Sequence, residues 1–187
     1  MSEHDSIRPS DLPPSTWVRR FASLIAPGGT VLDVATGFGR HARLLAGMGY
    51  RVEAVDRDPQ MLASLAAVPS IATRATDLEL AAWPYAPASF DGIVVTNYLY
   101  RPHFAALLDS LRPNGVLIYE TFMVGNEALG RPSNPNFLLQ RDELLERVSP
   151  ALTVIAFEQG RIEAPKRAIV QRICAIAGSA SSLPPIP

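Results

Sequence analysis

Short apolar segments that alternate with helical patterns constrain the fold of this chain more than any other feature. The first five segments are TVLDVA, RVEAVD, SIATRATD, FDGIVVTN and GVLIYET, and each ends in turn or loop residues. Runs of this length are typical of buried strands. Helical spacing of apolar residues separates several of them, at 39–48, 58–67 and 104–111. The alternation predicts βαβ units with right-handed crossovers and a mainly parallel sheet covered on both faces.

The pattern has a distinct beginning and end. Ser15 is a good N-cap residue, and apolar residues follow it at helical spacing until Pro27-Gly28-Gly29, so a leading helix is predicted there. After Thr121 the segment FMVGNEALGRPSNPN predicts a long loop, and a helix from about Phe137 or Arg141 to Val148 follows. LTVIAFEQ and RAIVQRICAIA then predict two antiparallel strands joined through GRIEAP.

The length of 187 residues fits a single domain. We expect that domain to span residues 15–177. The terminal segments 1–14 and 178–187 are rich in proline and small polar residues, which have little apolar surface to bury. They are predicted to be flexible.

Charge and cysteine content exclude several classes of partner. The formal net charge of −1 gives no overall attraction to nucleic acid or to anionic membranes, so neither is expected as a partner. The N-terminus lacks the apolar core of a signal peptide, and no run approaches the roughly 20 apolar residues needed to cross a bilayer. The single cysteine, Cys174, rules out an internal disulfide and a multi-cysteine zinc site, so we expect a cytoplasmic protein without a metal. Monomer and dimer both remain open.

The segment VLDVATGFGRHARLLAGMGYRVEAVDRDP carries the candidate chemistry. A strand ending at Asp33, a turn at Gly37 and Gly39, and a helix from about Arg40 place backbone amides at the edge where open α/β sheets bind ligands. A carboxylate at Asp33 would oppose a pyrophosphate but favour an ammonium or sulfonium group. Asp56 follows 23 residues after Asp33, where an acidic side chain accepts both ribose hydroxyls. Ribose without pyrophosphate, together with a cation, describes S-adenosyl-L-methionine.

The same residues carry a family resemblance. LDVATGFGRHARLLA followed by VEAVDRDPQML resembles the first motifs of class I S-adenosylmethionine-dependent methyltransferases, with Ala35 at the first glycine of Asp-x-Gly-x-Gly-x-Gly. NYLYRP and YETFMVGNEALGRPSNPNFLL are similar to a small bacterial subgroup of tellurite-resistance-type methyltransferases. The resemblance covers roughly residues 15–176. It implies a Rossmann-like three-layer sandwich with a mainly parallel seven-stranded sheet, order 3-2-1-4-5-7-6, whose last strand is antiparallel.

The resemblance also assigns roles in cofactor binding, with S-adenosyl-L-homocysteine as the product. The glycines would pass under the methionine and ribose, the first aspartate would hold the methionine end, and the second would bind the ribose. Two residues would flank the adenine and a third acid would lie near its amino group, while the end of the fourth strand would face the sulfonium side. In chain order the implied set is Asp33, Ala35, Gly37, Gly39, Asp56, Arg57, Asp77, Leu78, Thr96 and Asn97. The Ala35 methyl group is tolerable in the turn only if its φ stays negative, and we expect cofactor binding to survive it.

Methyl transfer from a sulfonium is an in-line displacement, so the protein has to align the acceptor and exclude water. No catalytic residue is assigned, and the candidate bases are Tyr98, Tyr100, His103 and Glu120. The long loop is predicted to cover the substrate site, and its candidate residues are Gly125, Asn126, Arg131 and Asn134. His41 is expected on a helix surface and Cys174 in the core.

The leading hypothesis is a methyltransferase acting on a small molecule, because the chain adds no separate recognition domain. The second is a cofactor-binding protein of the same fold without turnover, since the sequence offers no clear base and departs from the motif at Ala35. An NAD-dependent oxidoreductase is opposed by Asp33 and by the missing third glycine. DNA methylation is disfavoured because TNYLY lacks the Pro-Pro-aromatic element of amino-methylating enzymes, whereas protein and RNA acceptors remain open.

Overall fold

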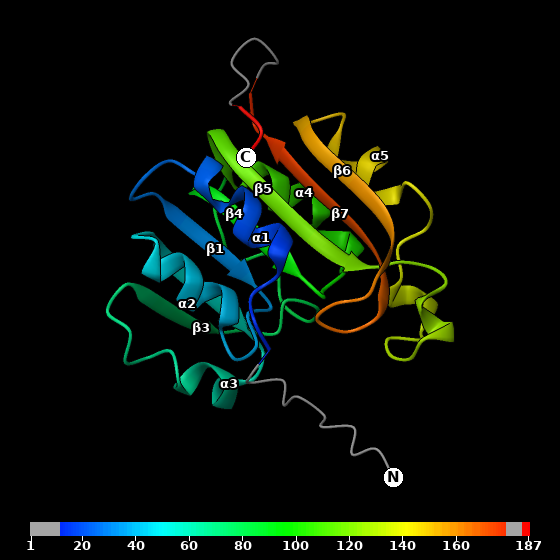
Figure 1. The fold of residues 1–187 in the computed structure, drawn as a ribbon. Helices are drawn as coiled ribbons and strands as arrows, with labels where there is room; N and C mark the ends of the chain where they lie inside the picture. The colour runs from blue at the N-terminus through cyan, green and yellow to red at the C-terminus, as the bar shows by residue number, and fades with distance from the viewer. Residues whose placement is uncertain (1–11, 179–184) are drawn as a thin grey trace.

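The computed structural model of this chain describes residues 12–178 and 185–187. Seven strands form one sheet in the order β3-β2-β1-β4-β5-β7-β6 (Figure 1). β7 is antiparallel to both β5 and β6, and the other neighbouring strands are parallel, so the predicted fold and strand order are confirmed. The strands are β1 (Thr30–Val34), β2 (Arg51–Asp56), β3 (Ile71–Ala75), β4 (Phe90–Thr96), β5 (Leu111–Phe122), β6 (Thr153–Ile162) and β7 (Ala168–Ile176). Most of the two ends predicted to be flexible, at 1–11 and 179–184, lies outside the described residues.

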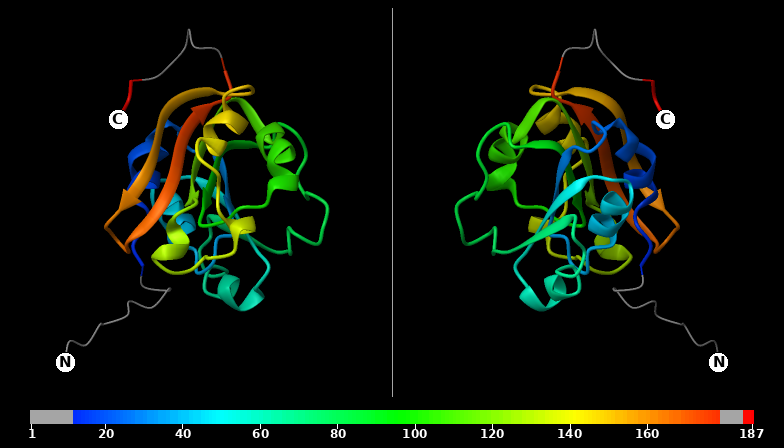
Figure 2. Two further views of the ribbon diagram at one scale, coloured as in Figure 1. Left: turned by 90° about the vertical axis from the view of Figure 1, so that its right-hand side faces the viewer. Right: turned by 90° about the vertical axis from the view of Figure 1, so that its left-hand side faces the viewer.

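Helices cover both faces of the sheet, as the two edge-on views in Figure 2 show. Buried side chains of three helices pack with one another and with one face of the strands: α1 (Thr16–Phe21), α2 (Arg40–Gly47) and α3 (Pro59–Ala63). α4 (Phe104–Asp109) and α5 (Glu143–Val148) contribute to a second core on the opposite face. In the described part of the chain no helix is both long and apolar enough to span a membrane.

Several element boundaries differ from the prediction. β5 begins at Leu111, before the predicted start at Gly115, because Leu111 pairs with Phe90 at the beginning of β4. The segment GRIEAP is not a simple connection, since β6 continues to Ile162 and pairs there with Ala168 of β7. The helix predicted from 58 to 67 ends at Ala63. Turns follow it, closed by backbone hydrogen bonds from Leu65 to the Leu62 carbonyl and from Val68 to the Leu65 carbonyl.

His41 is a buried residue and not the helix-surface residue that was expected. Its ring is 1% exposed because this side of α2 faces α1 and the sheet. The Ser15 backbone N–H donates to Nε2 at 3.0 Å, so the neutral ring carries its proton on Nδ1, which lies 3.2 Å from Thr96 Oγ1. The imidazole therefore ties the start of α1 to the end of β4. Burial, with Arg40 and Arg19 nearby, lowers the pKa of His41 to about 3.

We predict that His41 makes the folded state sensitive to acid. Between about pH 3 and pH 6.5 the unfolded ring binds a proton that the folded ring does not, so the stabilisation is complete above pH 6.5 and is lost as the pH falls. The free energy of unfolding of the wild type, minus that of His41→Gln, should shrink on acidification by up to about 1.4 kcal/mol per pH unit. Urea unfolding between pH 4 and pH 7.5 measures this difference. A difference that does not change with pH would mean that the folded ring titrates normally.

Candidate functional site

The turn between β1 and α2 forms the centre of the candidate site. Ala35, Gly37 and Gly39 have φ values of 51°, 56° and 75°, so three of its residues adopt the left-handed conformation. The Thr36 N–H donates to the carbonyl of Val55 at 3.0 Å, which attaches the turn to β2. At Gly39 a side chain would also collide with Leu65, so glycine is required there for space as well as for conformation.

Ala35 contradicts the expectation that its φ would be negative. The hydrogen bond from Thr36 to β2 and the two following glycines hold the chain in a left-handed turn, and Ala35 follows it with φ of 51°. A left-handed conformation costs a non-glycine residue about 1–2 kcal/mol. Strained residues of this kind persist where the surrounding structure determines them, and they often cluster at binding sites.

Asp56 connects the ends of β1 and β2. Its Oδ2 accepts from the Gly37 N–H at 2.8 Å, and its Oδ1 accepts from the Asp58 N–H at 3.0 Å. Each carboxylate oxygen can accept a further hydrogen bond, so the group can bind two more donors. Asp56 also lines a cavity at this edge of the sheet.

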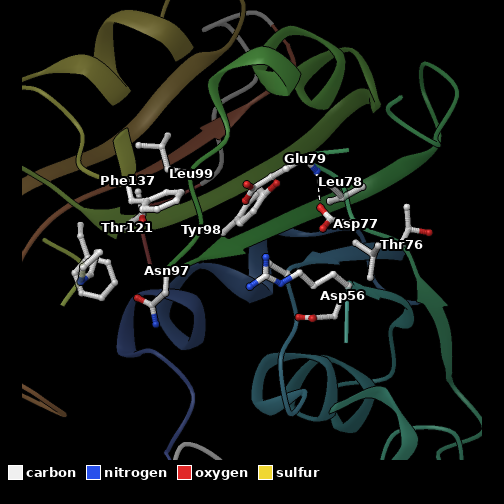
Figure 3. A pocket seen from close by; sticks show the side chains of 15 residues that line it. Asp56, Thr76, Asp77, Leu78, Glu79, Asn97, Tyr98, Leu99, Thr121 and Phe137 are labelled. Atoms are coloured by element: carbon white, nitrogen blue, oxygen red, sulfur yellow. Dashed lines mark hydrogen bonds between the residues drawn. The ribbon is translucent and has the colours of Figure 1, made fainter. Parts of the chain in front are cut away.

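This cavity measures about 340 Å³, within the range of small-molecule sites. Figure 3 shows Asp56, Thr76, Asp77 and Leu78 at one end, Thr121, Leu99 and Phe137 at the other, and Tyr98 between them. Six of the predicted cofactor residues line it, namely Ala35, Asp56, Arg57, Asp77, Leu78 and Asn97. The other four, Asp33, Gly37, Gly39 and Thr96, do not.

Gly37 still shapes the cavity through Asp56, whereas Asp33 bonds to Thr36, which does not line it. Gly37 donates to Asp56, and the Thr36 hydroxyl donates to Asp33 Oδ2 behind the turn. Thr96 is turned away because its hydroxyl bonds to His41. The structure thus gives Thr96 a role in joining elements, whereas the prediction had placed it facing the cofactor.

Asp33 is a buried carboxyl group with incomplete hydrogen bonding. It is 1% exposed, and its Oδ1 has no hydrogen-bond partner among the described residues. Burial raises the pKa of Asp33 to about 7, although the hydrogen bond from Thr36 opposes this shift. An unpartnered buried oxygen next to a ligand cavity is a feature that needs an explanation.

Three of the four candidate bases, Tyr98, Tyr100 and His103, have different surroundings. The Tyr98 hydroxyl is buried at the cavity wall with no hydrogen-bond partner among the described residues. Burial raises the Tyr98 pKa well above its ordinary value, so the group keeps its proton at neutral pH and acts as a donor and not as a base. Tyr100 donates to the Glu79 carbonyl at 3.1 Å, and His103 Nε2 lies 2.6 Å from the Leu78 carbonyl, so both support the wall without lining the cavity.

The loop after β5 is anchored to the sheet. It contains two short 3-10 helices, η4 (Asn126–Ala128) and η5 (Pro135–Phe137). Asn126 is 2% exposed, and its Oδ1 accepts from the Ile169 N–H at 3.1 Å. The Asn134 side chain caps η5 by accepting from the Asn136 N–H at 3.0 Å.

The loop contributes to two adjoining cavities. Pro132 and Phe137 line the larger one, and Asn126 and Arg131 line a second cavity of about 120 Å³. Gly125 and Asn134, which were also predicted for the substrate site, line neither of them.

Sequence reasoning missed several lining residues. Thr76 and Glu79 fall in a stretch rich in Pro and Ala that gave no periodic signal, and Thr121 was read only as the end of a strand. Pro132 and Phe137 come from a loop whose path depends on the buried Asn126. In the described part of the chain no cluster of His, Cys, Asp and Glu could hold a metal ion.

Comparison with known proteins supports the interpretation of this site. Residues 31–115, which include the turn, Asp56 and β4, match the family model described as a methyltransferase domain. That segment, less than half of the chain, is similar to a methyltransferase domain. The chain is 35% identical over 109 residues to a protein-L-isoaspartate O-methyltransferase of Chlorobaculum tepidum. That match covers 55% of this chain and 49% of the relative, so the chain spans about half the length of that protein.

Solved structures share the fold of this domain. TehB from Haemophilus influenzae superimposes with a TM-score of 0.71 at 20% identity, covering 85% of this chain and 60% of TehB. A SAM-dependent methyltransferase from Aquifex aeolicus gives a TM-score of 0.66 at 16% identity and covers 91% of this chain and 94% of its own. At these identities the likeness concerns the fold.

The residues present fit S-adenosyl-L-methionine. Asp56 has acceptor capacity left for ribose hydroxyls, Tyr98 has a buried donor without a partner, and Asp33 has a buried acceptor without a partner. Asp56 and Tyr98 line one cavity of about 340 Å³, in the range of small-molecule sites, and Asp33 lies two residues before Ala35, which also lines it.

We predict that Ala35→Gly stabilises the protein. Glycine removes the left-handed strain, so the free energy of unfolding should rise by up to about 1 kcal/mol and the melting temperature by roughly 2–4 °C. Ala105→Gly, on the exposed side of α4, is the matched control and should destabilise by about 1 kcal/mol. Calorimetry measures both variants. If the two variants changed stability in the same direction, Ala35 would not be strained.

We predict that cofactor binding releases a proton from Asp33. The ammonium group that S-adenosylhomocysteine shares with the cofactor favours the ionised carboxylate, and a group with a pKa of about 7 is largely protonated below that pH. Affinity for S-adenosylhomocysteine should therefore rise from pH 6 to about pH 8, and the heat of binding should vary with the ionisation enthalpy of the buffer. Titration calorimetry in two buffers tests this, with Asp33→Asn as the control that should lose both effects. A wild-type heat independent of buffer would show that Asp33 does not ionise on binding.

Proposed function

We propose that this protein transfers a methyl group from S-adenosyl-L-methionine directly to a small-molecule acceptor. The observation that carries this proposal is the Asp56 carboxylate, which lines the cavity. It accepts hydrogen bonds from the Gly37 and Asp58 N–H groups and can accept further hydrogen bonds from a ligand, within the segment that matches the methyltransferase domain. The bound cofactor supplies a methyl group on a positively charged sulfur, ready for displacement.

The chain's own residues would orient the two reactants. Asp56 would accept hydrogen bonds from ribose hydroxyls, and Leu78 and Arg57 would flank the base, since all three line the cavity and Asp56 and Leu78 lie at the same end of it (Figure 3). Tyr98 would donate a hydrogen bond from its buried hydroxyl. Alignment of the reactants accounts for much of the rate in displacements of this type.

The opposite end of the cavity would exclude water. Leu99, Phe122, Pro132 and Phe137 give it an apolar wall, and the loop that carries the last two is held in place by Asn126. Removing water strengthens the electrostatic interactions within the site and prevents competing hydrolysis.

Tyr98 would not remove a proton from the acceptor, because the pKa of the Tyr98 hydroxyl is raised. Among the described residues that line the second cavity, Glu120 is the sole carboxylate, and it is 8% exposed. An acceptor that reacts as an anion needs no base at all.

We predict that Asp56→Ala weakens binding of S-adenosylhomocysteine by about 100-fold, the loss of roughly two hydrogen bonds to a charged group. Asp109→Ala is the control, because that exposed carboxylate lies at the end of α4, outside both cavity linings. Titration calorimetry gives the two affinities. Equal affinity for the wild type and Asp56→Ala would refute the ribose assignment.

Turnover separates this proposal from a cofactor-binding protein without activity. Incubation of the wild type with methyl-labelled cofactor and a metabolite extract should transfer label to a small molecule. An NAD-dependent enzyme would instead gain thermal stability on addition of NAD, and no such gain is expected.

A further inference from the structure

The second cavity adjoins the first and shares Asn97 and Phe122 with it. Its walls come from the segment before α1, the start of α2, the ends of β4 and β5, the loop after β5 and the β6–β7 hairpin. An engineered protein cavity of about 150 Å³ holds a benzene molecule, so the present volume of about 120 Å³ encloses a group of similar size or smaller.

Cations dominate the charge around this second cavity. Arg40, Arg131, Lys166 and Arg167 all line it, and Lys166 is the only lysine of the chain. Arg167 forms an ion pair with Glu163 at 3.2 Å. The other three have no ion-pair partner among residues 12–178 and 185–187.

Glu120 lines the same cavity, and its charge acts on Arg40 but is shared with a further cation. Its Oε2 lies 3.4 Å from an amino group of Arg172, which does not line the cavity. The lining of this cavity contains four cations and one carboxylate, whereas the whole chain has a formal net charge of −1. Positive charge is therefore concentrated at this cavity. A positively charged cleft raises the local concentration of anions.

We propose that this second cavity binds a small anionic methyl acceptor, with Arg131 and Lys166 holding its charged group. The reacting atom would lie toward Asn97 and Phe122, where the two cavities meet. This proposal rests on the proposed methyltransferase function and specifies the class of its acceptor.

The carboxylate of the cofactor is the competing occupant. Arg40 begins α2 directly after the glycine turn, so it is the cation placed to meet the amino-acid tail of the cofactor. Arg131 and Lys166 belong to the outer loop and to the hairpin, and their exposed side chains can be exchanged without disturbing the core. Variants of these two residues therefore distinguish acceptor binding from cofactor binding.

The first experiment titrates the complex of the protein with S-adenosylhomocysteine. Propionate, its neutral amide and inorganic phosphate are probes of similar size, and they distinguish an organic acid from an inorganic oxyanion. Propionate or phosphate should bind in calorimetry or in ligand-detected NMR, and propionamide should not. Equal binding of propionate and propionamide, or anion binding seen only before S-adenosylhomocysteine is added, would overturn the proposal.

The variant Arg131→Gln/Lys166→Gln should weaken binding of the anionic probe by about 100-fold, the loss of two charge-assisted hydrogen bonds. Its affinity for S-adenosylhomocysteine should remain that of the wild type. Arg51→Gln/Arg141→Gln removes the same two charges from exposed positions outside both cavities and should change neither affinity. A loss of cofactor affinity in the first variant would assign these cations to the cofactor and overturn the proposal.

The second experiment fractionates a metabolite extract by anion exchange before incubation with methyl-labelled cofactor. Label should enter the retained, anionic fraction and should fall in the Arg131→Gln/Lys166→Gln variant. Label confined to the unretained fraction would refute an anionic acceptor while supporting the methyltransferase function. If no fraction is labelled although S-adenosylhomocysteine binds, the proposed turnover fails, and the probe titrations alone decide whether the cavity binds anions.

Discussion

The hydrogen bond from the Gly37 amide to Asp56 Oδ2, at 2.8 Å, is the contact on which the site depends. Parallel pairing of β1 with β2 places Val34 opposite Val55, so the two strands end side by side. Their polar loops would diverge from there without a further connection. Asp56 supplies it, and the bond from Thr36 to the Val55 carbonyl reinforces it. One carboxylate thereby organises the turn and also presents acceptors to the cavity.

Departures from local structural preference concentrate around this contact. Ala35 takes a left-handed conformation. Asp33 Oδ1 and the buried Tyr98 hydroxyl have no hydrogen-bond partner among the described residues. Elsewhere, the cores on the two faces of the sheet consist of ordinary aliphatic and aromatic packing. Strain and unpaired polar atoms cost stability, and they are retained where a ligand can compensate for them.

The larger cavity depends on the strand order of the fold, and the smaller one depends on local features of this chain. The larger cavity is built on the ends of β1, β2 and β4, which every open parallel sheet of this order brings together. The smaller one depends on the loop after β5 and on the β6–β7 hairpin, which Asn126 joins through its bond to Ile169. Loops placed on a rigid sheet in this way commonly carry specificity.

Apolar periodicity and strand-to-helix turns are local properties of the chain, so the strands, the helices between them and the positions of Asp33 and Asp56 could be predicted from the sequence. The strand order was expected from the family resemblance. Asp56 could be placed at this edge because parallel strands end there, whereas Asp77 and Asn97 were expected at the site from the family resemblance. The sign of φ at Ala35 could not be predicted, since hydrogen bonds from a different strand decide it. Tertiary structure alone buried His41 against Ser15 and Thr96, because that contact joins residues far apart in the chain. Tertiary packing also places Thr121 and Phe137 in the lining of the same cavity as Asp56, because packing and not sequence spacing brings those segments together.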